Sequence, residues 1–197
     1  MRIGVAATAP IGADVLERLA ATHEIAFLLT RPDARQGRGR KLAPPPAKLV
    51  AAQLGIPVHQ PEKPALPEQV ERIVVCAYGL YIPPRLLEQS LWLNVHPSLL
   101  PRWRGAAPVE RTILAGDEET GVTIHRTVEA LDAGPIAAQE AFDLDAEADA
   151  GLVFAHAAEI AARLIDDVLP DPVFTPQAEE GITYAEKITP EDRELDL

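Results

Sequence analysis

The opening stretch RIGVAATAPIGADVLERLAATHEIAFLLT, residues 2–30, decides the fold. Residues 2–7 form a short apolar run, which ends at Thr8-Ala9-Pro10. Val15, Leu16 and Leu19 then recur at helical spacing, and residues 24–30 form a second apolar run of strand length. A strand, a helix and a second strand in succession predict a parallel sheet with a right-handed crossover.

The rest of the chain extends this sheet. Further strands are predicted at 56–58, 73–77, 91–95, 120–128 and 136–142, and further helices at 47–54, 106–115 and 148–169. Residues 120–128 alternate apolar and polar side chains, which predicts a half-exposed strand with residues 136–142 as an antiparallel partner and with His125 and Arg126 at the surface. We therefore predict an α/β protein with a Rossmann-like, open, mostly parallel twisted sheet.

The 197 residues suffice for one core without disulfides or metals to hold it. We predict one domain at residues 1–170. Beyond it the pattern fades into prolines, Gly181 and an acidic end, which predicts a linker at 171–197 leading towards a further domain.

Charge divides the chain into two parts. Residues 1–116 hold 14 basic and 9 acidic residues, a net +5, whereas residues 117–197 hold 4 and 21, a net −17. A polyanionic partner should therefore meet the first part. No apolar run approaches the roughly 20 residues that a membrane-crossing helix needs, and residues 1–7 lack the pattern of a signal peptide. We expect a cytoplasmic protein without a membrane partner.

Several common site motifs are missing. The first strand-to-helix turn lacks the glycines of a dinucleotide site, and the chain contains neither G-x-x-x-x-G-K-[ST] nor G-x-S-x-G. The five histidines show no zinc-binding spacing, and Cys76 is the single cysteine. No metal is expected.

Polar residues gather instead at the end of one predicted strand. Asn94 and His96 lie two residues apart, so they point to one face of the sheet. In open α/β sheets, ligands bind beyond the carboxyl ends of strands. Asp132, which ends another strand-and-turn segment, is the carboxylate expected to converge on them.

These residues and their surroundings resemble a known family. Asn94-x-His96 followed by Ser98-Leu99-Leu100-Pro101, with Asp-x-Gly at 132–134, is similar to the formyltransferases that use 10-formyltetrahydrofolate. The resemblance covers about residues 1–190 and implies the sheet of the formyltransferase type. It is strongest to those members that formylate methionyl-tRNA, on the blocks at 31–44, 60–61, 77–80, 100–108 and 115–124.

The resemblance implies three catalytic residues. Asn94 would donate its amide N–H to the developing oxyanion, and His96 would donate to the same oxygen or relay a proton. Asp132 would favour the imidazolium form of His96 and fix its orientation. The residues implied in folate binding are Leu80, Tyr81, Ile82, Ser98, Leu99, Leu100, Pro101, Glu129, Ala130 and Leu131. Trp103 either packs under the turn at 98–101 or faces the substrate.

The basic stretch at 31–48 combines six basic residues with one acidic residue, two glycines and four prolines, which predicts a long exposed loop. The resemblance implies that it grips the acceptor stem of methionyl-tRNA. The residues implied in these phosphate contacts are Arg35, Arg38, Arg40 and Lys41.

Three alternatives remain open. An enzyme that formylates a UDP-amino-sugar or another small amine would reuse the same three catalytic residues, although such substrates need fewer cations than the basic stretch offers. A formyltetrahydrofolate hydrolase would use water as acceptor. A non-catalytic RNA-binding module would need neither Asn94, His96 nor Asp132.

Overall fold

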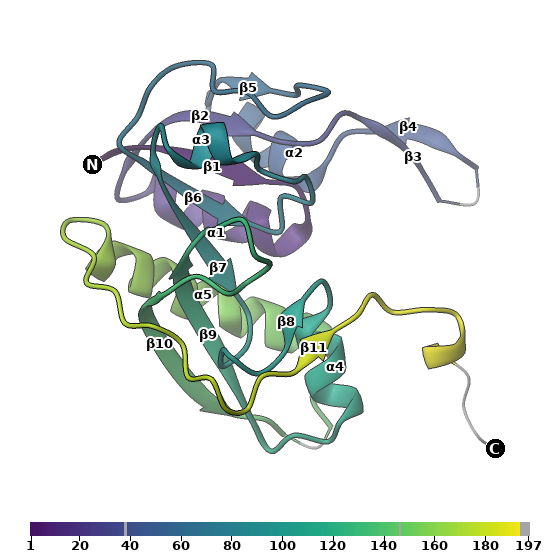
Figure 1. Cartoon of the computed structure of the whole chain (residues 1–197). Helices are drawn as coiled ribbons and strands as arrows, with labels where there is room; N and C mark the ends of the chain where they lie inside the picture. The colour runs from purple at the N-terminus through teal and green to yellow at the C-terminus, as the bar shows by residue number, and fades with distance from the viewer. Residues whose placement is uncertain (38, 146, 194–197) are drawn as a thin grey trace.

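A seven-stranded mixed sheet forms the centre of the computed structural model (Figure 1), which describes residues 1–37, 39–145 and 147–193. Its strand order is β10-β9-β7-β6-β1-β2-β5. Five strands are parallel, namely β1 (Arg2–Ala7), β2 (Glu24–Leu29), β5 (Val58–His59), β6 (Arg72–Cys76) and β7 (Leu91–His96). The antiparallel strands β9 (Glu119–Arg126) and β10 (Ile136–Asp143) complete the sheet. The predicted α/β class with a mostly parallel sheet is confirmed.

One face of the sheet is covered by helices. Helix α1 (Pro10–Ala20) packs against both α2 (Pro46–Gln53) and α5 (Ala150–Val168), and α5 also packs against β9 and β10 (Figure 1). The side chains buried here come from the predicted stripes of α1 and α5 and from alternate strand positions such as Leu93, Val95, Val122 and Ile124. Burial of these stripes is the main source of helix stability.

The opposite face has a second core and a different cover. Phe27, Tyr78 and Trp92 are buried there, and the Trp92 indole N–H donates to the Leu86 carbonyl in the short helix α3 (Pro84–Leu87), at 2.8 Å. Helix α4 (Pro108–Leu114) lies further along the chain and contacts α5. At the β7–β9 side this second face is covered by loops, and the predicted catalytic residues lie beneath them.

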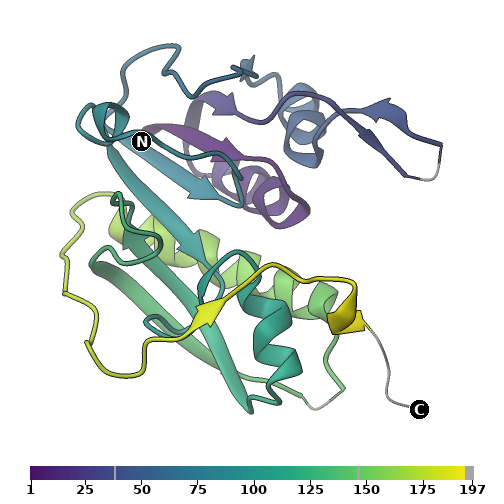
Figure 2. The same ribbon diagram turned by 45° about the vertical axis from the view of Figure 1, so that its right-hand side comes forward.

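The basic stretch is a hairpin rather than an irregular loop. Strands β3 (Ala34–Gln36) and β4 (Lys41–Ala43) pair antiparallel and project from the body of the molecule (Figure 2). Glycine, proline and charge density predicted exposure but not pairing, because two three-residue strands are too short to produce an alternating pattern. The exposure itself is observed at both Arg35 and Lys41.

Residues 171–193, named here the C-terminal segment, pack on the domain. The segment runs from the end of α5 to β11 (Tyr184–Ala185), which lies parallel to β8 (Arg104–Gly105) (Figure 1), and then to a 3-10 turn at Glu191–Arg193. On the way Thr175 and Ile136 exchange two backbone hydrogen bonds, at 2.8 and 2.9 Å. Phe174 packs against the core and Ala185 is buried, so backbone hydrogen bonds and a few apolar side chains hold this segment to the domain. That residues 171–197 act as a linker, and that a further domain follows, stay predictions.

Candidate active site

The structure brings the three predicted catalytic residues together. Asn94 and His96 lie on β7 and point away from α5, while Asp132 lies on the loop between β9 and β10 that folds back over them. The amide nitrogen of Asn94 is 3.4 Å from Asp132 Oδ1, and His96 Nδ1 is 3.7 Å from Asp132 Oδ2. Their convergence, predicted from strand position, is therefore present, whereas their catalytic roles stay predictions.

His125 is a fourth member of this cluster that the sequence analysis placed at the surface. The prediction is wrong, because His125 is only 1% exposed. It pairs directly with Asn94 across the β7–β9 ladder, so both side chains share one face of the sheet. Its Nε2 accepts from the Asn94 amide at 3.0 Å and lies 3.5 Å from Asp132 Oδ1. Alternation gives the face on which His125 lies, but the loops that cover this face come from distant parts of the chain.

The loop after β7 fixes the hydrogen position on His96. His96 Nε2 lies 2.7 Å from the Trp103 carbonyl oxygen, which accepts only, so Nε2 carries the hydrogen and neutral His96 has its lone pair on Nδ1, facing Asp132. Trp103 has a left-handed backbone, with φ of 63°. Its indole N–H donates to Asp117, and the Arg102 guanidinium lies 4.4 Å from the ring centroid. The Trp103 side chain thus packs beside the turn, and its carbonyl is what reaches the cluster.

Burial decides the charge of His96. Burial lowers the pKa of His96 and outweighs both the Asp132 carboxylate and the Trp103 carbonyl, which raise it. Asp132 by its charge favours the imidazolium form, but loss of hydration exceeds the attraction of this one carboxylate 3.7 Å away. Neutral His96, with a free Nδ1, is the resting form.

Asp132 is the anion of the cluster. Burial raises its pKa, but His125, His96 and the backbone N–H of Gly105 outweigh burial and hold the pKa below its usual value. The Gly105 N–H donates to Asp132 Oδ2 at 2.8 Å. Asp132 itself has a φ of 47°, a left-handed conformation that aspartate tolerates better than most residues. The site therefore combines a fixed carboxylate, a neutral imidazole with a free nitrogen and an amide donor.

The residues predicted to bind folate divide into exposed and buried positions. Tyr81 and Leu131 are 62% and 66% exposed, and both Glu129 and Ala130 are exposed beside Leu131. Leu80, Leu99 and Pro101 are half-buried, whereas Ile82 and Leu100 are buried. Ser98 is fully buried, and its hydroxyl donates to the Arg102 carbonyl at 2.7 Å. In this structure Ser98 and Leu100 shape the turn, and contact of the whole set with folate stays a prediction.

The predicted phosphate-binding residues lie on the projecting hairpin. Arg35, Arg40 and Lys41 are exposed, and Arg38 lies outside the described residues. The Arg35 guanidinium donates to the Arg40 carbonyl at 3.1 Å. By contrast, the Lys48 ammonium binds Asp33 and Gln60 at 2.7 and 2.8 Å, which anchors the base of the hairpin.

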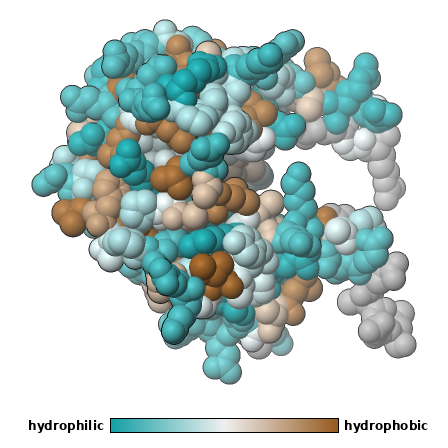
Figure 3. Space-filling view, in the orientation of Figure 1, coloured by the Kyte–Doolittle hydropathy of each residue, from teal (hydrophilic) through white to brown (hydrophobic). Residues whose placement is uncertain are grey.

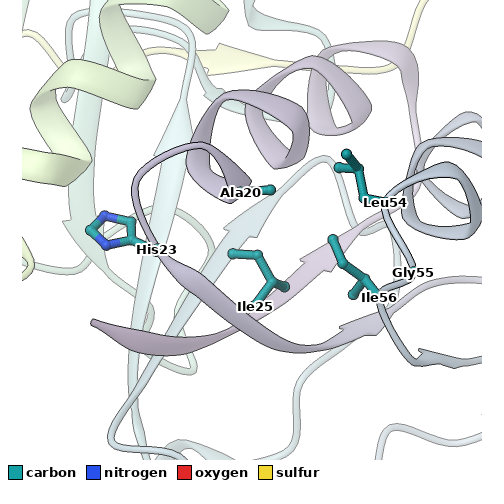
Figure 4. Close-up of a pocket in the computed structure, with 6 residues that line it drawn as sticks. All are labelled: Ala20, His23, Ile25, Leu54, Gly55 and Ile56. Atoms are coloured by element: carbon teal, nitrogen blue, oxygen red, sulfur yellow. The ribbon is translucent and has the colours of Figure 1, made fainter.

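The surface is hollowed beside the hairpin. Figure 3 shows a recess between the upper part of the molecule, from which the hairpin projects, and the lower part that contains β8 and β11. Figure 4 shows a separate, small pocket, lined by Ala20, His23, Ile25, Leu54, Gly55 and Ile56. Ile25 lies near the amino end of β2, so this pocket is at the amino ends of the parallel strands. Ligands of such folds bind at the opposite, carboxyl ends.

Two absences are observed within the described ranges 1–37, 39–145 and 147–193. In these ranges no group of three or more His, Cys, Asp or Glu side chains is arranged to hold a metal ion. No helix in the same ranges combines the length and the apolar character needed to span a membrane.

Comparison with known proteins assigns the family. The model of the family described as Formyl transferase matches residues 1–169. A methionyl-tRNA formyltransferase of Stenotrophomonas maltophilia (strain K279a) is 40% identical over 213 residues, which cover 100% of this chain and 69% of that protein.

Solved structures agree on the fold. The N-formyltransferase from Helicobacter canadensis, in complex with folinic acid and dTDP-3-aminofucose, matches with a TM-score of 0.72 and 18% identity, over 96% of this chain and 71% of that one. Phosphoribosylglycinamide formyltransferase from Bacillus halodurans matches with a TM-score of 0.68 and 23% identity, over 87% and 96%. With its matched residues, its shared fold and the cluster around Asp132, this chain belongs to the formyltransferase family.

Proposed function

We propose that this chain transfers the formyl group of 10-formyltetrahydrofolate to the amino group of methionyl-tRNA, for the initiation of translation. The observation that carries the proposal is the 40% identity to a methionyl-tRNA formyltransferase along the full chain. The meeting of Asn94, His96 and Asp132 on one buried face supports it, since amide, imidazole and carboxylate are the groups that acyl transfer to an amine needs.

10-Formyltetrahydrofolate supplies the activated formyl group when bound. Asn94 stabilises the negative charge that develops on the formyl oxygen. Of the two contacts of its amide nitrogen, the one to His125 is 3.0 Å long and the one to Asp132 is 3.4 Å. The N–H at the longer, weaker contact is the one available for exchange with a substrate oxygen.

His96 accepts the proton that the attacking amine loses, and Asp132 stabilises the charge that results. Neutral His96 accepts a proton at Nδ1, directly or through one water, from the amine that attacks the formyl carbon. The new N–H then faces Asp132 Oδ2, which lies 3.7 Å away and stabilises the imidazolium. The same proton then passes to N10 of the folate as the bond between N10 and the formyl carbon breaks, which releases tetrahydrofolate and returns His96 to its neutral form. The low pKa of Asp132 keeps it ionised throughout this transfer.

Folate binds, in this proposal, along the loops at 80–82, 98–101 and 129–131. The exposed Tyr81 and Leu131 fit the flat, partly apolar pterin ring, and backbone groups of these loops supply polar contacts. No metal takes part in this chemistry.

The acceptor stem of the tRNA lies along the hairpin, where Arg35, Arg40 and Lys41 are exposed. Arg38 is proposed to join them on the evidence of sequence alone. The net −17 of residues 117–197 repels phosphate, so the hairpin is the side on which a tRNA is held. A cytoplasmic location follows from a role in translation.

An acceptor screen tests the proposal. The full chain is incubated with 10-formyltetrahydrofolate and with methionyl-tRNA, a UDP-amino-sugar or water alone, and tetrahydrofolate release is followed. We expect release to depend on methionyl-tRNA, with uncharged tRNA as the matched control. Release that depends on the amino-sugar, or that proceeds equally in water, would refute the proposed acceptor.

A further inference from the structure

We propose that Gln177, in the C-terminal segment, is a positioning residue that holds the Asp132 turn against the loop carrying Gly105. The inference rests on the proposed function, because it is the chemistry at Asp132 that gives this contact a consequence. It assigns to residues outside the matched range 1–169 a part in building the active site.

Both ends of the Gln177 side chain are engaged. Its amide nitrogen donates to the carbonyl of Asp132 at 2.7 Å and to that of Gly134 at 2.8 Å. Its amide oxygen accepts from Nε and Nη2 of Arg104, at 3.0 and 2.6 Å. Gln177 therefore satisfies two carbonyls of one loop and a guanidinium of another in a single bridge.

The bridge lies at a place where both loops need support. Asp132 has a left-handed φ of 47°, and such conformations persist only when surrounding contacts over-determine them. A Cβ at Gly134 would overlap the Arg126 carbonyl, so this turn is pressed closely against β9. The two Gln177 bonds attach the same turn to the C-terminal segment.

The second loop is held by the same segment. Arg104 precedes Gly105, whose N–H donates to Asp132 Oδ2 at 2.8 Å. Thr183 accepts from the Trp103 N–H at 2.8 Å, and its carbonyl accepts from the Arg104 N–H at 2.9 Å. Since the Trp103 carbonyl accepts from His96, the C-terminal segment supports the surroundings of both His96 and Asp132.

Loss of the Gln177 bridge should change the pKa of the Asp132 carboxyl group. The ionisable groups that face Asp132 are His96 from β7 and His125 from β9, and Arg104 is linked to it through Gln177. If the turn relaxes, Asp132 loses contact with the histidines and with the Gly105 N–H. These contacts lower its pKa, so the pKa should rise towards the ordinary value for aspartate.

The test uses two substitutions in the full chain. Gln177→Met keeps the volume and removes both hydrogen-bonding ends, whereas Gln177→Glu can still accept from Arg104 but cannot donate to the two carbonyls. Glu179→Gln, at an exposed position of the same segment, is the matched control. The readouts are kcat, the KM values for both substrates, and the Asp132 pKa followed by carboxyl NMR titration.

We expect both Gln177 variants to lower kcat by roughly 10- to 100-fold with KM values within about twofold, because a displacement near 1 Å has this effect on a positioned group. The Asp132 pKa should rise in both variants and stay unchanged in Glu179→Gln. A parent-like kcat and an unchanged Asp132 pKa in Gln177→Met would overturn the inference. A parent chain without formyl transfer would overturn the proposed function instead, and the titration would still decide the role of Gln177.

Discussion

Removing the charge of Asp132 tests the proposed proton transfer most directly. In Asp132→Asn the side chain keeps its size, and its oxygen can still accept from the Gly105 N–H, so the fold should persist. The substitution removes the attraction between the Asp132 carboxylate and the His96 imidazolium that forms during proton transfer. With Oδ2 and Nδ1 3.7 Å apart, this attraction is roughly 4 kcal/mol at an effective dielectric constant of 20. The asparagine dipole replaces part of it, which leaves a loss of about 2–4 kcal/mol. We therefore expect the single-turnover rate constant of formyl transfer to fall roughly 30- to 1,000-fold.

The pH dependence gives a second, signed expectation. In the parent, burial holds the pKa of His96 below 6.5, and the acidic limb of the pH–rate profile should lie below that pH because His96 must be neutral to accept a proton. Asp132 raises the pKa of His96, so its neutralisation lowers this pKa further. The acidic limb of Asp132→Asn should move to lower pH although the maximum rate falls.

The assay is single-turnover formylation of methionyl-tRNA by saturating full-length chain, followed from about pH 5 to 8, the range in which histidine titrates. Asp167→Asn, on the exposed side of α5, is the matched control and should behave as the parent. An acidic limb that stays in place or moves to higher pH would refute the role given to Asp132. So would a rate within twofold of the parent.

Three further expectations concern other parts of the molecule. Replacing Arg35, Arg40 and Lys41 of the hairpin with alanine should reduce the slope of log tRNA affinity against log salt by roughly 0.7–0.9 per lost phosphate contact, as measured by filter binding. An unchanged slope would show that the hairpin does not contact tRNA phosphates. His125→Phe should leave the half-buried Asn94 N–H without its acceptor, lower the free energy of unfolding by about 1–3 kcal/mol in urea titration and slow formyl transfer. Parent-like stability and rate would count against the place of His125 in the cluster. Gly121→Ala would bring a Cβ into the Glu140 carbonyl and the Leu99 side chain, so the free energy of unfolding, followed by thermal unfolding, should fall by about 1–3 kcal/mol or more. An unaltered Tm would contradict this packing.

The sequence predicted well those features that depend on periodicity. The strands ending near Ala7, Cys76 and His96 are nearly continuous buried runs, and the long helix α5 buries a regular stripe. Apolar runs and hydrophobic spacing therefore located them within a few residues. Asn94 and His96 were found because two residues on one strand share a face and a strand end marks a cleft. Asp132 was added because it ends another strand-and-turn segment, and the resemblance to a family then implied catalytic roles for all three residues.

Other features depended on contacts between distant segments. The short pairs β3–β4 and β8–β11 have too few residues for a period, and the C-terminal segment attaches through backbone hydrogen bonds and a few apolar side chains, which form no regular hydrophobic pattern. The charge of His96 was predicted from its partner alone, whereas burial, which is set by the loops packed over it, outweighs that partner.

The sequence by itself determined the layered α/β fold, the strand that carries Asn94 and His96, and the basic character of the hairpin, because these follow from the order and spacing of residue types along the chain. Only the tertiary structure decided that His125 is buried in the cluster, that His96 rests neutral, and that Gln177 joins the Asp132 turn to Arg104. The physical reason is that burial and hydrogen bonding at this site come from loops that cover the sheet face opposite α5, and such long-range contacts leave no local signal in the sequence.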